Sequence, residues 1–124
     1  MRRTMTCSLA GALLLGLLAC DKEHLSQEND KPKHTIKEIM ALAHKKGLMK
    51  KAILGTATAD EKKALVEYYI DLAKNEPTKG GAQSWKEKTT ALVKAARDVE
   101  AGKPGAGVAL RKAVDCDTCH GVHK

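Results

Sequence analysis

The chain has 124 residues and a formal net charge of +7; 43% of its residues are hydrophobic, yet only 2% are aromatic. This length suits one small domain and leaves no room for a dinucleotide-binding enzyme fold. The apolar content excludes a wholly disordered chain, and the shortage of β-branched and aromatic residues disfavours a β-sandwich.

Residues 1–19 are expected to be an export signal rather than part of the fold. Arg2 and Arg3 form a basic start, and the apolar run that follows is too short to span a membrane as a helix. The run ends in Leu-Leu-Ala-Cys, which resembles the lipobox of bacterial lipoproteins. The resemblance implies that Cys20 is acylated and anchors an exported protein to a bacterial membrane, on the periplasmic side. The alternative is an ordinary signal peptide, which would leave a soluble periplasmic protein.

Residues 20–34 are expected to be a lipidated cysteine followed by a flexible tether, because this stretch is polar and carries both charges. His24 and His34 are accordingly expected to be solvated. The folded domain is predicted at residues 35–124. Its first helix shows an apolar stripe at helical spacing, then a break near Gly47, and it ends at Gly55. The members of the stripe are Ile36, Ile39, Met40 and Ala43.

Two further helices are predicted to begin at capping boxes. The second helix is expected to begin at Thr58, with Glu61 three residues later, and to end near Asn75. The third helix is expected to begin at Ser84, with Glu87 in the same role. These positions divide the middle of the domain into two amphipathic helices joined by a short loop.

A fourth helix is predicted to have Pro104 in its first turn and to continue without interruption into the C-terminal residues. Helices with short connections, each apolar on one side, predict an all-α fold arranged as an antiparallel four-helix bundle. Tyr68, Tyr69 and Trp85 are expected in its core, and His123 is expected to be exposed at the chain end.

The residues that carry chemistry lie at the end of this fourth helix. Cys116, Cys119 and His120 form the C-x-x-C-H pattern of covalent haem c attachment. At this spacing both thiols lie on one helical turn and can add to the two vinyl groups of haem, while His120 supplies the proximal iron ligand. A redox C-x-x-C pair would need a βαβ context, and a zinc site would need His123 as a fourth ligand within eight residues.

The position of this motif resembles that in the class II cytochromes c, the family of cytochrome c prime and its low-spin relatives. The resemblance covers about residues 35–124, and its specific part is Cys116, Cys119 and His120. It implies a haem inside the bundle with His120 on the iron. In cytochrome c prime the sixth position is left to gases such as nitric oxide, whereas the low-spin relatives fill it with a Met from the first helix and transfer electrons.

Two side chains of the first helix are candidates for that sixth position. Met40 belongs to the apolar stripe and is the expected ligand, while His44, one turn later, is the alternative. An empty or apolar-blocked position is the remaining alternative, and Met40 would then only fill the core. Arg111, which precedes the motif by one turn, is a candidate partner for a haem propionate.

The expected function is that of a monohaem c-type cytochrome, with haem c iron as its cofactor, that carries single electrons at a bacterial membrane surface. A five-coordinate protein that binds nitric oxide or carbon monoxide is the alternative, and a structural lipoprotein holding zinc is a third. The sequence offers no acid–base pair or nucleophile, so no enzyme is expected. The basic charge favours an anionic membrane or acidic redox proteins as partners rather than nucleic acid. The family resemblance adds a homodimer as one oligomeric form.

Overall fold

The structure is a computed structural model that describes residues 31–124; the predicted signal, Cys20 and most of the tether lie outside the described residues. The prediction of an all-α fold is confirmed, because every regular element within residues 31–124 is helical. None of these helices is long and apolar enough to cross a membrane. The elements are α1 (Ile36–Ile39), the π-helix η1 (Met40–Lys45), α2 (Leu48–Leu54), α3 (Ala59–Lys74), α4 (Ala82–Glu100), α5 (Ala106–Ala113) and α6 (Cys116–His123).

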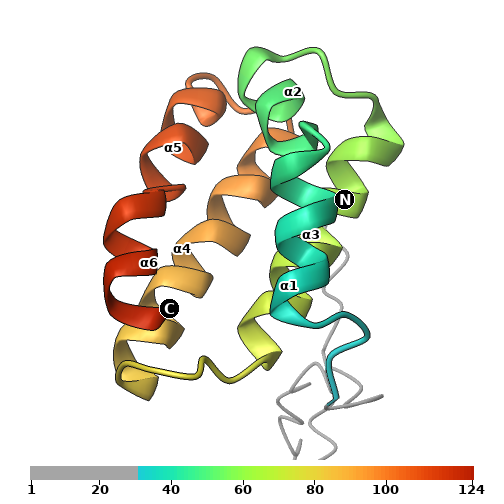
Figure 1. The fold of residues 1–124 in the computed structure, drawn as a ribbon. Helices are drawn as coiled ribbons and strands as arrows, with labels where there is room; N and C mark the ends of the chain where they lie inside the picture. The colour runs from blue at the N-terminus through green and yellow to red at the C-terminus, as the bar shows by residue number, and fades with distance from the viewer. Residues whose placement is uncertain (1–30) are drawn as a thin grey trace, which may run out of the picture.

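Successive segments run in opposite directions (Figure 1). The segment α1–η1–α2 rises, α3 returns, α4 rises again, and α5 with α6 returns to the level of α1. Helix α4 packs against both α3 and α5, while α2 contacts α3 and α5 at one end of the molecule. These contacts bring the first and last segments of the domain close together in space.

The first segment starts at a capping box and changes its helical form after one turn. The backbone N–H of Glu38 bonds to Thr35 Oγ1, and the Glu38 carboxylate accepts from the Thr35 N–H at 2.7 Å. The π-helix η1 follows, with bonds that span five residues instead of four. The predicted break is confirmed at Gly47, which has a φ of +80°, and α2 ends at Gly55 as expected.

One of the two predicted capping boxes is present. Thr58 and Glu61 cap α3, and Asn75 ends it. The prediction that Ser84 caps the next helix is wrong, because α4 begins at Ala82 after Gly81, without a side-chain cap. Ser84 instead lies inside the first turn of α4, and its hydroxyl forms a hydrogen bond with His123 of α6.

The last segment is interrupted, in contrast to the single helix predicted. Val114 leaves the helical conformation, with φ −84° and ψ 57°, so α5 ends just before it. Asp115 then caps α6 by accepting a hydrogen bond from the Thr118 N–H at 3.1 Å. Pro104 lies outside α5, which begins at Ala106. The motif therefore occupies a short helix of its own.

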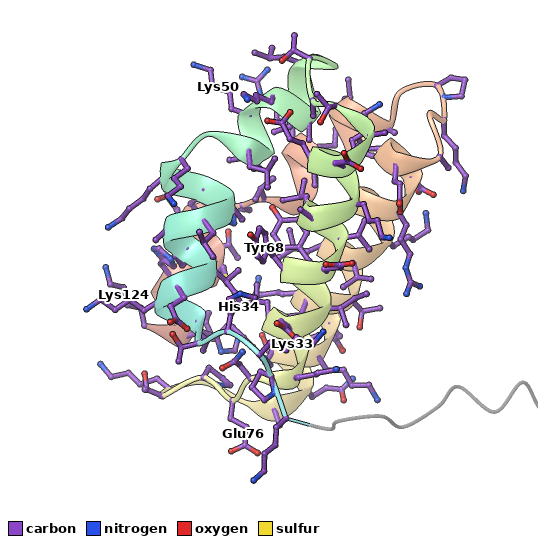
Figure 2. All side chains as sticks on the ribbon, turned by 90° about the vertical axis from the view of Figure 1, so that its right-hand side faces the viewer. Lys33, His34, Lys50, Tyr68, Glu76 and Lys124 are labelled. Carbon is purple, nitrogen blue, oxygen red and sulfur yellow. The ribbon has the colours of Figure 1, made fainter. Side chains whose placement is uncertain are left out.

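His34 is only partly exposed and is bound to α3, in contrast to the solvated position expected for it. Its Nδ1 lies 2.9 Å from Asp71 Oδ2, and its ring meets that of Tyr68 edge-on at 5.3 Å. Figure 2 shows these two labelled rings next to each other beside α3. The amide of Asn75 also donates to the His34 carbonyl at 2.9 Å. The start of the domain is therefore fixed to the end of α3.

The core contains the expected aromatic residues together with aliphatic side chains from every long segment. Tyr69 and Trp85 are buried, as predicted, while Tyr68 is half-buried. At the α2–α5 contact, Gly107 lies so close to α2 that a Cβ there would be 2.5 Å from the Ile53 carbonyl oxygen. The fully buried aliphatic side chains are Ile39, Leu65, Leu72 and Leu110.

Candidate functional site

A cavity of about 530 Å³ lies between the first segment of the domain and α6. Its volume is in the range of small-molecule and cofactor sites, and its lining is mostly apolar, as is usual for such sites. Helices α3 and α4 supply its floor. The apolar side chains of the lining are Ile36, Leu72, Trp85, Leu92, Ala113 and Val114.

One wall of this cavity is the C-x-x-C-H motif. Cys116, Cys119 and His120 all line it, and neither sulfur is in a disulfide. Cys116 is exposed and Cys119 half-buried, and burial raises the pKa of the Cys119 thiol. Because the Asp115 cap starts α6 just before the motif, both thiols lie on the first turn of this helix and share one face with the cavity.

The opposite wall carries both predicted candidates for a sixth ligand. Met40 begins η1, and His44 lies one turn later, near the end of η1. Both side chains line the cavity together with His120. Burial lowers the pKa of His44 and favours its neutral imidazole, and the proximity of His120 acts in the same direction. The structure thus brings the two candidates to the same space as the motif.

Two buried polar atoms next to the cavity lack a partner. His44 Nε2 and the Tyr69 hydroxyl have no hydrogen bond to any described residue. The two rings are neighbours, with centroids 5.9 Å apart. Burial raises the pKa of Tyr69, and the nearby Cys116 thiol contributes in the same direction. Buried polar groups are usually hydrogen-bonded, so these two neighbouring unpartnered atoms call for an explanation.

His123 is buried, in contrast to the exposed position predicted for it. The Lys79 carbonyl accepts from Nδ1 at 3.0 Å, Ser84 Oγ lies 3.1 Å from Nε2, and the Trp85 ring packs edge-on at 5.2 Å. Both ring nitrogens are therefore engaged, which disfavours His123 as a zinc ligand. No group of three or more His, Cys, Asp or Glu placed to hold a metal occurs within residues 31–124.

Lysines line the cavity, and Arg111, the charged residue expected there, does not. Arg111 is exposed and does not line the cavity, so the structure does not bring it to the site. Four lysines do line it: Lys37, Lys45, Lys88 and Lys124. The positions of Lys37 and Lys45 at the cavity could have been predicted from a helical projection of the first helix around Met40. The position of Lys88 depends on how α4 packs.

The arrangement combines two thiols, a thioether and the imidazoles of His44, His120 and His123 around one apolar space with a basic lining. Such a space can enclose a flat apolar group, attach it through sulfur and supply ligands to a metal at its centre. Comparisons with protein-family models, with curated proteins and with solved structures find no match to this chain.

Proposed function

We propose that the protein is a monohaem c-type cytochrome that carries single electrons at a bacterial membrane surface. One observation carries this proposal: a single apolar cavity has Cys116, Cys119 and His120 on one wall and Met40 and His44 on the other. The proposal includes the finer fold expected from the class II cytochromes c, an antiparallel four-helix bundle around the cofactor.

The residues at the cavity fit a haem. The apolar floor suits the macrocycle, the two thiols share the first turn of α6, and the His44 imidazole lines the same cavity as His120. The lysines of the lining offer positive charge to the two propionates. When bound, the haem iron supplies the one-electron couple.

The chain's own side chains would hold, orient and shield that group. Cys116 and Cys119 would hold the haem through thioether bonds, each formed by addition of a thiol S–H across one vinyl double bond, with the hydrogen passing to the other vinyl carbon. His120 would bind the iron. The apolar floor would exclude water from the macrocycle, which would help to set the reduction potential.

The membrane location is part of the proposal and rests on the sequence. Cys20 would carry the lipid, and residues 21–34 would hold the domain near the periplasmic side of the membrane. The partners in this setting are redox proteins and the membrane itself. The net charge of +7 would favour acidic partner surfaces.

Gas binding at a five-coordinate iron is the second candidate. In this case neither Met40 nor His44 would bind the iron, and the cavity between them and His120 would leave room for a diatomic ligand. The two candidates share the attachment site and differ only in whether a side chain occupies the sixth position.

The attachment is tested by expressing the full chain with a haem c maturation system and staining denaturing gels for covalent haem. We expect haem on the wild type and its loss in the Cys116→Ala/Cys119→Ala double variant. Asp117→Ala, which changes an unconstrained position between the cysteines, is the matched control and should retain haem. A wild-type chain without covalent haem under these conditions contradicts the proposal.

A further inference from the structure

We propose that His44, through Nε2, supplies the sixth iron ligand, and that Met40 lies beside it as an apolar neighbour. This inference rests on the proposed function, because it concerns the same cavity. It differs from the sequence prediction, which favoured Met40. The protein would accordingly be a low-spin cytochrome with two histidine ligands.

The unpartnered nitrogen is the main argument for His44. A buried imidazole nitrogen without a hydrogen bond loses its hydration and gains nothing in return, and such groups in folded proteins usually signal a missing ion or a functional role. His44 Nε2 is in this position among the described residues, and the side chain lines the cavity opposite the motif. A bond to iron would give that nitrogen the partner that the protein does not supply.

Met40, in contrast to His44, does not need a bonding partner. A thioether is only a weak acceptor, so Met40 can line an apolar cavity without a partner at little cost. The remaining polar groups of the lining on this side are the ammonium groups of Lys37 and Lys45. An ammonium group has no lone pair to donate and is a poor iron ligand. His44 is therefore the strongest donor opposite His120.

The surroundings of His44 also suit a ligand. The Tyr69 ring packs against the imidazole at a tilt of 46°, which restricts its rotation. The residue also lies in a π-helical turn, a distortion that occurs often at functional sites.

The first test uses the wild-type holoprotein, full chain, without any substitution. Iron bound by a thioether gives a weak far-red charge-transfer band in the oxidised state, and two histidine ligands do not. We expect a low-spin spectrum without this band and an electron paramagnetic resonance signal typical of two imidazoles. A thioether band, or a high-spin wild-type spectrum, overturns the assignment of His44.

The second test compares two substitutions one turn apart. His44→Ala should convert the oxidised spectrum from low-spin to high-spin, and added imidazole should restore the low-spin form. Met40→Leu, which keeps the volume, should stay low-spin. The reverse pattern, with high-spin Met40→Leu and low-spin His44→Ala, overturns the proposal.

The two proposals fail in distinguishable ways. Absence of covalent haem from the wild-type chain overturns the cytochrome itself, whereas covalent haem with a thioether band overturns only the role of His44. If His44→Ala does not fold, the wild-type spectra still decide the question. A reduction potential below that of His–Met cytochromes c would agree with His44, because a Met ligand raises the potential.

Discussion

His123 is held in place by the first turn of α4 and by the loop before it, about forty residues earlier in the chain. The Lys79 carbonyl and the Ser84 hydroxyl bond to its two ring nitrogens. Gly80 lies directly against the ring with a φ of +85°, and a Cβ at this position would overlap the imidazole and the Val122 carbonyl oxygen. The position therefore requires glycine both for its backbone conformation and for space. These contacts attach the end of the motif helix to the rest of the domain.

A substitution at this loop tests the attachment. Gly80→Ala should lower the free energy of unfolding by about 2 kcal/mol, because a left-handed alanine is strained and its Cβ displaces the His123 ring. Gly81→Ala, with a φ of −80° and open space around the new Cβ, is the matched control and should cost much less. Chemical denaturation of both variants measures the difference. Equal losses would show that the contact with His123 contributes little.

At the scale of elements, the start of α6 fixes how the motif is presented. The Asp115 carboxylate accepts hydrogen bonds from the N–H and the hydroxyl of Thr118, and these bonds lower its pKa. A carboxylate in the first turn also interacts favourably with the positive end of the helix. Because α6 begins anew at this point, its direction is independent of α5, and the motif can face the cavity.

A second cap links two elements and gives a pH-dependent prediction. Glu61 closes the capping box of α3 and accepts from Lys51 Nζ of α2 at 2.6 Å. The hydrogen bond from Lys51, and then that from the Thr58 backbone, lower the pKa of Glu61 below its ordinary value of 4.5. A carboxylate with a lowered pKa stabilises the fold above its ordinary pKa, and this stability is lost as the pH falls through the lowered value.

Glu61→Gln should therefore reduce the free energy of unfolding at neutral pH, and the difference from the wild type should shrink as the pH falls below 4.5. Glu67→Gln on the same helix is the control, because Glu67 is exposed and forms no ion pair within residues 31–124. Urea denaturation at a series of pH values follows both variants. A difference that persists unchanged in acid would contradict the role of the ionised carboxylate.

At the scale of the whole molecule, the domain is closed at one end and open at the other. Gly107 lets α5 touch α2 at the closed end, whereas α1 and η1 are separated from α6 by the cavity. Small side chains make up a large part of the core, so the chain contains little bulk with which to fill this space. The buried alanines are Ala43, Ala52, Ala57, Ala95, Ala96 and Ala106.

A cavity of this size predicts that the proposed haem would contribute to stability. The Cys116→Ala/Cys119→Ala chain, prepared without haem, should melt about 10 °C or more below the haem-loaded protein, which corresponds to about 2 kcal/mol for a domain of this length. Its unfolding transition should also be less cooperative, because the cavity walls would lack the haem that both of them would contact. Calorimetry on both forms measures this. Equal melting temperatures would indicate that the core is complete without the cofactor.

Much of the helical organisation was predictable because its signals are local. The stripe of the first helix, the break at Gly47 and the Thr58–Glu61 box each depend on residues a few positions apart, and all are present. The predictions for Ser84, His34 and His123 were wrong for a common reason. Each of these side chains has a partner far away in the chain, at 37 to 44 residues, and no local pattern reveals such a partner.

The sequence by itself determined the all-α class and the cluster of two thiols and an imidazole, because helix periodicity and the motif are both properties of neighbouring residues. Only the tertiary structure decided what faces that motif. Helix packing placed Met40 and His44 across one cavity from His120, buried Tyr69 behind them and left His44 Nε2 without a partner. Burial and the loss of hydrogen bonds arise only when distant segments meet, so the sequence pattern, which favoured Met40, could not reveal the unpartnered nitrogen of His44.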